Sequence, residues 1–153
     1  MNTPLTKDMF IQINVVVKDI EKAAEGWASI LGIEKPVIEN RHLEASEGGP
    51  YTYRGENVPC DLLVADIPMG QFVLELHQPA DGDSSFSEFL EKHGNGVHHL
   101  GFEVGDKRDE VIRGLSALGF DTERTFGGYP GSSWTIVDSE DVLGVNLNIK
   151  PVR

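Results

Sequence analysis

The sequence of 153 residues lacks several features that mark large classes of protein. It has a single cysteine, Cys60, which excludes an internal disulfide and any CxxC metal or redox motif. No run approaches the roughly 18 consecutive apolar residues of a membrane-spanning helix. The N-terminal stretch MNTPLTKDMF has no apolar segment resembling a signal peptide. We therefore expect a cytoplasmic protein without a membrane partner.

Basic residues are also scarce. The chain has 13 Lys and Arg against 25 Asp and Glu, which gives a formal net charge of −12 at pH 7. Such a charge repels phosphate backbones, so we expect no nucleic-acid partner. An anionic substrate would need a local cluster of the few Arg and Lys residues. The length fits one domain, which we assign to residues 1–153.

The sequence does contain an internal repeat. Residues 11–33 (IQINVVVKDIEKAAEGWASILGI) align without a gap with residues 98–120 (HHLGFEVGDKRDEVIRGLSALGF), at an offset of 87 residues. Each copy predicts a strand, an Asp that caps a helix (Asp19, Asp106) and an amphipathic helix ended by Gly (Gly32, Gly119). The predicted buried stripes are Ile20, Ala23, Ala24, Trp27, Ile30 and Leu31 in the first helix, and Val111, Leu115 and Leu118 in the second.

Three further strands are predicted in each copy. They are PVIENRHLEA, VPCDLLVADI and QFVLELHQP, with a hairpin turn at Met69-Gly70, and then FDTERTF, SSWTIVDS and GVNLNIK. A linker helix near residues 84–94 joins the copies, with Ser85 and Glu88 at capping-box spacing. The prediction is an α+β fold of two βαβββ modules, near residues 8–80 and 96–150, related by a pseudo-twofold axis.

Side-chain alternation separates a polar from an apolar face on each strand. Between residues 98 and 104 the apolar side chains share a face with His98, which leaves His99 on the opposite, concave side. For His98 we expect packing or a hydrogen bond at a strand edge. The repeat places Gln12 at the position equivalent to His99, and the closing strands FVLELHQ and GVNLNI add polar positions. Four strands thus offer one polar residue each toward a common cleft: Gln12, Glu75, His99 and Asn148.

The motifs QINVVVKDIEKA, LELHQP and GVHHLGFEV, with the repeat, resemble the vicinal oxygen chelate superfamily, which includes glyoxalase I and methylmalonyl-CoA epimerases. The resemblance covers nearly the whole chain. It implies the glyoxalase/bleomycin-resistance/dioxygenase-like fold and a divalent metal (Zn, Ni or Co) held by one residue from the first and last strand of each module. Gln12, Glu75 and His99 match three ligands of the Gln/Glu/His/Glu set of zinc-type glyoxalase I. Asn148 stands in place of the fourth ligand, a Glu.

The resemblance implies a lyase or isomerase that stabilises the enolate of a small carbonyl or thioester substrate. A metal held by N and O ligands polarises two vicinal oxygens, while a carboxylate takes the proton. With Asn148 neutral, Glu75 is the one anionic ligand, so metal affinity should be low, and Glu75 is also the candidate base. Epimerases carry another glutamate ahead of the third strand, for which Glu56 is the nearest candidate. Glutathione recognition is unsupported, because Val16 stands where glyoxalase I has a basic residue.

Three other polar residues on the cleft strands are candidate substrate contacts: Asn14, His77 and Asn146. Simple solvation explains His77 equally well. The alternative function is a metal-free small-molecule binding protein of the same fold, which Asn148 favours. An extradiol dioxygenase fits less well, since only His99 matches its His/His/Glu iron set. Because chains of this kind leave sheet edges that a second subunit could cover, we expect a homodimer.

Overall fold

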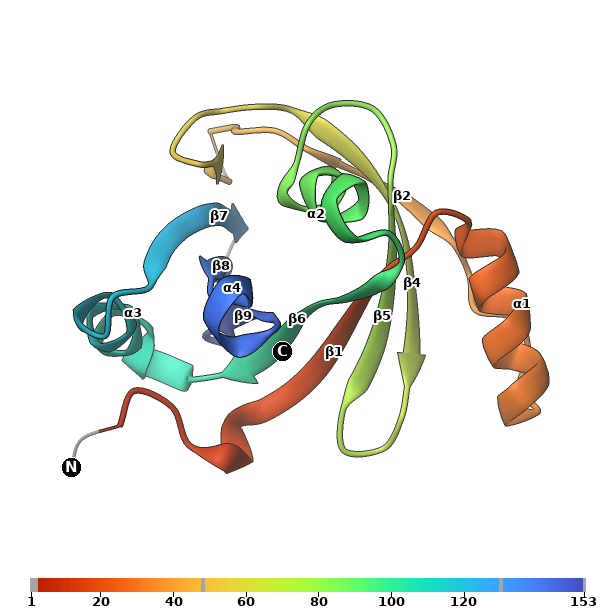
Figure 1. The fold of residues 1–153 in the computed structure, drawn as a ribbon, viewed down its shortest axis with the longest axis horizontal. Helices are drawn as coiled ribbons and strands as arrows, with labels where there is room; N and C mark the ends of the chain where they lie inside the picture. Colours follow the sequence, from red (N-terminus) through yellow and green to blue (C-terminus); the bar gives the residue numbers. More distant parts are fainter. Residues whose placement is uncertain (1–2, 48, 130, 153) are drawn as a thin grey trace.

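The computed structural model describes residues 3–47, 49–129 and 131–152. Nine strands form a single mixed sheet in the order β2-β4-β5-β1-β6-β9-β8-β7-β3, which curls until it is nearly closed (Figure 1). The predicted α+β fold is confirmed. In the part of the chain that is described, no helix combines the length and the apolar character needed to cross a bilayer.

The two halves of the chain have corresponding elements. The first half contains η1 (Lys7–Met9), β1 (Phe10–Val16), α1 (Ile20–Leu31), β2 (Glu39–Leu43), β3 (Tyr51–Tyr53), β4 (Cys60–Pro68) and β5 (Val73–Pro79). The linker helix is α2 (Ser85–His93). The second half contains β6 (Gly96–Glu103), η2 (Gly105–Lys107), α3 (Arg108–Ala117), β7 (Asp121–Tyr129), β8 (Ser132–Asp138), α4 (Glu140–Leu143) and β9 (Asn146–Lys150). The turn at Met69-Gly70 joins β4 to β5 as predicted.

Strand pairing gives both halves the same topology. The first strand of each half pairs parallel with the last one, β1 with β5 and β6 with β9. The two first strands, β1 and β6, pair antiparallel at the centre of the sheet. Polar residues on these four neighbouring strands are thereby brought to the concave side. His98 lies on the central strand β6 and not at a strand edge as predicted. The predicted packing and hydrogen bonding are confirmed, since its ring packs on Phe86 and its Nε2 lies 3.2 Å from the carbonyl oxygen of Ser85.

The sequence interpretation missed β3. This three-residue strand belongs to the first half of the chain, but it pairs antiparallel with β7 of the second half, with Tyr51 opposite Gly127. Its length is below that of an ordinary strand, and its partner lies far along the chain, so no local pattern announced it. As a result, the first half supplies the strand that ends the sheet of the second half.

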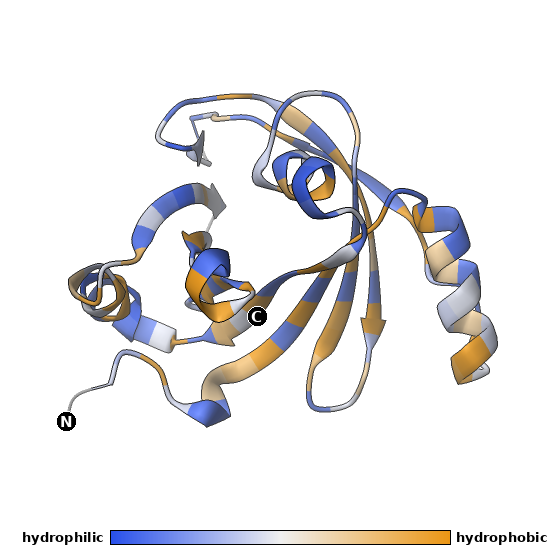
Figure 2. Ribbon diagram, in the orientation of Figure 1, coloured by the Kyte–Doolittle hydropathy of each residue, from blue (hydrophilic) through white to orange (hydrophobic). Residues whose placement is uncertain are grey.

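The outer face of the sheet is covered by α1, against β4 and β5, and by α3, against β7 and β9 (Figure 1). Ile20 and Ala24 of α1 are buried, but Ile30 and Leu31 are 78% and 39% exposed, contrary to the predicted stripe. The C-terminal end of α1 is apolar (Figure 2) and lies in solvent. Leu118, after α3, is likewise 65% exposed.

The helix starts agree with the predicted caps in one case out of three. The Asp19 carboxylate accepts a hydrogen bond from the Lys22 N–H and caps α1. Asp106 caps no helix, because it lies within η2, and α3 begins only at Arg108 without a side-chain cap.

The capping box of α2 begins one residue earlier than predicted. Ser84 rather than Ser85 is the N-cap, and Ser87 completes the box. Glu88, assigned to that box from its spacing, instead accepts hydrogen bonds from Tyr53 and Arg54. Glu88 thus pairs with Arg54 instead of capping the helix, and the Ser87 side chain accepts from the N-cap backbone N–H in its place.

One buried cation ties the second half together. The Arg124 side chain on β7 is only 1% exposed. Its Nη1 donates to Glu140 Oε1 at 2.6 Å and to Asn146 Oδ1 at 2.8 Å, and lies 3.4 Å from Asp138 Oδ1. Its Nη2 lies 3.5 Å from Glu88 Oε1 on α2. A single guanidinium therefore links α2, β8, α4 and β9 to β7.

Candidate functional site

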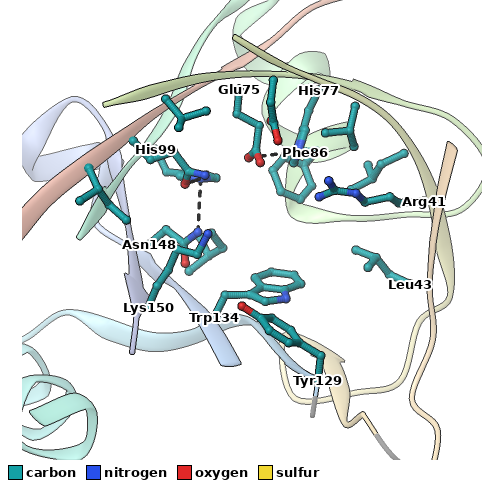
Figure 3. A pocket seen from close by; sticks show the side chains of 17 residues that line it. Arg41, Leu43, Glu75, His77, Phe86, His99, Tyr129, Trp134, Asn148 and Lys150 are labelled. Atoms are coloured by element: carbon teal, nitrogen blue, oxygen red, sulfur yellow. Dashed lines mark hydrogen bonds and ion pairs between the residues drawn. The ribbon is translucent and has the colours of Figure 1, made fainter. Parts of the chain in front are cut away.

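The concave side of the sheet encloses a cavity of about 430 Å³, within the usual range for a small-molecule site. Its polar and aromatic lining comprises Gln12, Arg41, Asp66, Glu75, His77, Phe86, His99, Tyr129, Trp134, Asn148 and Lys150. Glu75, His77, His99 and Asn148 point in from the central strands, and Trp134 and Tyr129 form the facing wall (Figure 3).

Strand register explains why the four predicted cleft residues meet. Asn14 lies opposite both Glu75 and His99, and Gly101 lies opposite both Gln12 and Asn148. The antiparallel junction of β1 and β6 thus places the repeat-related pair Gln12 and His99 side by side, with Gln12 Oε1 3.1 Å from His99 Nε2. All four residues line the same cavity. Their predicted metal-binding roles are not established by this placement.

A glycine makes room for Gln12. A Cβ added at Gly101 would lie 2.7 Å from both Cβ and Oε1 of Gln12. A side chain at this position would therefore push Gln12 away from His99. The absence of a side chain at Gly101 therefore helps to determine the geometry of the site.

His99 is buried, and both of its ring nitrogens have polar neighbours within 3.5 Å. Its Nδ1 lies 2.8 Å from Nδ1 of His98, and its Nε2 faces Gln12 and, at 3.5 Å, Nδ2 of Asn148. Burial lowers the pKa of His99 well below its ordinary value, and the neighbouring His98 and His77 act in the same direction. The imidazole is therefore neutral at pH 7, as a metal ligand or an acceptor must be.

Glu75 is the buried carboxylate of the site. Its Oε1 accepts a hydrogen bond of 2.9 Å from Asn14 Nδ2 and lies 3.2 Å from His77 Nε2. Burial disfavours its charge, but His77, the hydrogen bond from Asn14 and the cations of the cavity bring its pKa below the ordinary value. Glu75 is thus ionised at neutral pH and able to bind a cation or accept a proton.

Of the remaining predicted site residues, one lines the cavity and the others do not. His77 lines the cavity. Asn14 and Asn146 are fully buried and do not line it: Asn14 supports Glu75, and Asn146 accepts from Arg124 and donates to the carbonyl of His98. Glu56 lies in the exposed turn after β3, outside the cavity.

Several cavity residues were not anticipated from the sequence. Lys150 follows Asn148 by two residues and so shares its face, and Asp66 lies directly opposite Glu75 in the predicted hairpin. Strand alternation and hairpin register could have identified both. Partial burial, together with the nearby Glu75 carboxylate, raises the pKa of Asp66. Arg41 and Trp134 reach the cavity only because the sheet curls, which no local pattern reveals.

We expect Gly127→Ala to disturb the aromatic wall. Gly127 lies opposite Trp134 in the β7–β8 pair, and a Cβ there would lie 2.2 Å from the indole ring. Displacing the ring should cost about 1–3 kcal/mol of unfolding free energy, measured in urea, and change the tryptophan fluorescence. Gly26→Ala is the control, since its Cβ meets nothing within 4 Å and should stabilise α1. Equal stability of Gly127→Ala and the wild type would show that the indole has another position available.

The donor atoms of the cavity suit a divalent cation, although only one of these donor groups carries a charge. No three His, Cys, Asp or Glu side chains of the described residues gather as a metal site, because the convergent set holds one carboxylate, one imidazole and two amides. Gln12 Oε1 and His99 Nε2 lie 3.1 Å apart, close enough that one cation would contact both. Asn148 Oδ1 is buried without a hydrogen-bond partner in the described chain. These atoms suit a weakly held cation.

We compared the chain with known protein sequences and structures. No curated protein sequence matches the chain. Among solved structures, a hypothetical protein from Bacillus halodurans aligns with a TM-score of 0.60 and 17% identity, covering 92% of this chain and 91% of that one. Methylmalonyl-CoA epimerase from Mycobacterium tuberculosis aligns with a TM-score of 0.56 and 21% identity, covering 97% and 93%.

The Streptomyces coelicolor methylmalonyl-CoA epimerase, solved with 2-nitronate-propionyl-CoA, aligns with a TM-score of 0.56 and 22% identity, covering 92% of each chain. At these identities the likeness concerns the fold. The model of the glyoxalase/bleomycin resistance protein/dioxygenase superfamily matches residues 11–135, most of the chain. The repeat, the curled sheet and this match lead to one conclusion: the chain belongs to the glyoxalase/bleomycin resistance protein/dioxygenase superfamily.

Proposed function

We propose that this protein is a metal-assisted lyase or isomerase of the glyoxalase and methylmalonyl-CoA epimerase type, which forms an enolate from a small carbonyl or thioester compound. The observation that carries the proposal is the meeting of Gln12, Glu75, His99 and Asn148 in one cavity. Glu75, the buried anion of this set, has a pKa that keeps it ionised. A carboxylate in this state can remove a proton from a carbon next to a carbonyl group.

The residues of the cavity would have separate roles in this reaction. Gln12, His99 and Asn148 would hold the metal with Glu75 through neutral N and O donors, as their convergence suggests. A bound divalent cation would supply a Lewis acid for the oxygens of the substrate. Asn14 fixes the Glu75 carboxylate by its hydrogen bond, so that the second oxygen is free to face the substrate carbon.

The cavity wall supports a substrate with an anionic end and an apolar part. Arg41 and Lys150 are cations among the lining residues of a strongly acidic chain, and they lie on different sides of the cavity (Figure 3). Trp134 and Tyr129 offer an aromatic surface for apolar groups. Related epimerases bind CoA esters, as their solved complexes state, which favours a thioester substrate here.

Proton exchange tests the reaction. We expect the protein, supplied with Zn²⁺, Ni²⁺ or Co²⁺, to exchange the α-hydrogen of a methylmalonyl thioester or of a 2-oxoaldehyde hemithioacetal with D₂O, followed by NMR. Glu75→Gln should reduce this exchange about a hundredfold or more, because it removes the base. Glu56→Gln, in an exposed turn outside the cavity, should leave it unchanged. Full exchange activity in Glu75→Gln would remove Glu75 from the role of base.

One observation favours a second candidate, a metal-free binding protein. Two of the four convergent residues, Gln12 and Asn148, are neutral amides, and much of the cavity wall is apolar or aromatic. If the wild type shows no α-hydrogen exchange and no metal binding by calorimetry at millimolar metal, this second function is the better reading of the cavity.

A homodimer remains part of the proposal. Two features support a second copy as the partner: β2 is an exposed outer strand of the sheet, and the nearby apolar residues Ile30 and Val37 are each 78% exposed. Light scattering should give twice the chain mass at micromolar concentration. The double variant Ile30→Asp, Val37→Asp should give a single chain mass. Leu118→Asp should not, because Leu118 follows α3, a helix on the opposite side of the molecule from α1 (Figure 1). A wild type of single chain mass would contradict the prediction.

A further inference from the structure

His98 is a buried histidine for which the proposed chemistry has no direct use. Its ring is enclosed by the linker helix α2, 4.5 Å from the Phe86 ring and 5.2 Å from the Phe89 ring between centroids. Its side chain is 0% exposed, so it cannot touch a substrate in the cavity. Both ring nitrogens nevertheless have defined partners. Nε2 lies 3.2 Å from the carbonyl oxygen of Ser85, and Nδ1 lies 2.8 Å from Nδ1 of His99.

These contacts determine where the protons lie. A carbonyl oxygen can only accept, so Nε2 of His98 must carry a hydrogen and donate it to Ser85. The ring of His98 is enclosed by Phe86 and Phe89, and its hydrogen-bond partners are the Ser85 carbonyl and His99 rather than a carboxylate, so a charge on the ring is disfavoured and Nδ1 has a lone pair. That lone pair accepts the hydrogen of His99 Nδ1. A neutral imidazole carries one hydrogen, so a His99 ring that donates from Nδ1 has none on Nε2.

We propose that His98 is a positioning residue: together with the Ser85 carbonyl, it holds His99 in the tautomer that presents an unprotonated Nε2 to the cavity. The inference gains its functional meaning from the proposed function, since a metal ligand needs this lone pair. The chain of hydrogen bonds itself exists whatever the cavity binds. This chain begins at Ser85, the first residue of α2, so the linker helix determines the protonation of a histidine on β6.

The tautomer restricts what can bind at His99. An unprotonated Nε2 accepts hydrogen bonds or binds a cation, and it cannot donate to a substrate oxygen. Oε1 of Gln12, also an acceptor, lies 3.1 Å from it, and Nδ2 of Asn148 lies 3.5 Å away. Two lone pairs facing each other at this distance repel unless a cation lies between them or the Gln12 amide turns to donate. His99 therefore selects a metal ion, or a ligand with an N–H or O–H group, over a bare anion.

Nitrogen NMR tests the proposal on the whole protein without metal or substrate. Long-range ¹H–¹⁵N correlation spectra at pH 7.5 distinguish the two neutral tautomers, and His98→Asn and His99→Ala assign the signals. We expect His98 to carry its hydrogen on Nε2 and His99 on Nδ1. A hydrogen on Nε2 of His99, or a charged His99 ring, would overturn the proposal.

Two substitutions of His98 separate positioning from packing. In His98→Phe the ring still packs on Phe86 and Phe89, but the acceptor for His99 is gone, so the His99 tautomer should become mixed. His98→Asn retains an acceptor oxygen near the position of Nδ1 and should restore the tautomer. A His99 tautomer that is unchanged in His98→Phe contradicts the proposal. Thermal unfolding of both variants shows whether packing is maintained.

Metal affinity is the second readout. In titrations with Ni²⁺ or Co²⁺, loss of the partner that orients a histidine ligand should weaken binding about 10- to 100-fold in His98→Phe and leave His98→Asn within about threefold of wild type. A wild type that binds no metal while showing the expected tautomers would reject the proposed function and retain the positioning role. Metal binding that is equal in His98→Phe and wild type, although the His99 tautomer is shifted in the variant, would overturn the inference that this tautomer matters for metal binding.

Discussion

Replacing Asn148 by Glu is expected to strengthen the binding of Zn²⁺, Ni²⁺ or Co²⁺ at least tenfold, or about 1.4 kcal/mol. Glu75 on β5 and Asn148 on β9 occupy matching positions in the two halves. In each half, this residue lies two positions after the one that pairs with Gln12 or His99. The substitution adds a second carboxylate one methylene longer than the amide. A carboxylate binds a dication far better than a neutral amide does. Calorimetric titration of the purified variants measures the change.

Two further variants make this result specific. Asn148→Gln adds the same length without charge and should bind no better than wild type. His99→Ala should abolish binding in both the wild-type and the Asn148→Glu backgrounds, since it removes the one imidazole among the four residues. Negligible metal binding by wild type and Asn148→Glu alike, with a loss of stability from crowding a charge into the cavity, would favour the binding protein instead.

Arg124→Met is expected to destabilise the protein by about 3–5 kcal/mol, because it leaves buried carboxylates without their cation. Glu140 is the most affected: its side chain is 7% exposed and loses a 2.6 Å bond, and its remaining ion-pair partner among the described residues is the partly exposed His93. Glu88 and Asp138 retain Arg54. Urea unfolding measures the change in the free energy of unfolding.

The matched control is Arg113→Met, at an exposed position on α3, which should change stability by no more than about 0.5 kcal/mol. Glu140→Gln in the Arg124→Met background should recover a large part of the loss, because it removes the charge left unpaired. A cost below about 1 kcal/mol in Arg124→Met would mean that water reaches the carboxylates and replaces the guanidinium.

The repeat explains how much of this protein could be predicted from its sequence. Period-two patterns marked eight of the nine strands, and the gap-free offset placed Gln12 and His99 at equivalent positions, which the structure brings 3.1 Å apart. The superfamily resemblance is confirmed by the family match. The division into modules near residues 8–80 and 96–150, and the metal-binding roles, stay predictions.

What escaped prediction depends on tertiary contacts. Arg41 belongs to an exposed outer strand by its local pattern, and only the curl of the sheet turns it toward the cavity. Asn146 follows the same alternation as Asn148, but Arg124 covers it and takes its oxygen. Alternation assigns a face to a side chain and says nothing of what already occupies that face. Both placements depend on neighbours distant in the chain.

The pairing of β3 with β7 has a consequence for how the molecule comes apart. Because the first half supplies the last strand of the sheet around the second half, and β1 pairs with β6 at the centre, the halves are joined at two separate places. Melting either half exposes unpaired backbone on the other. The duplicated units are therefore not independent folding units, and damage to one half is expected to lower the cooperativity and the midpoint of unfolding of the whole chain.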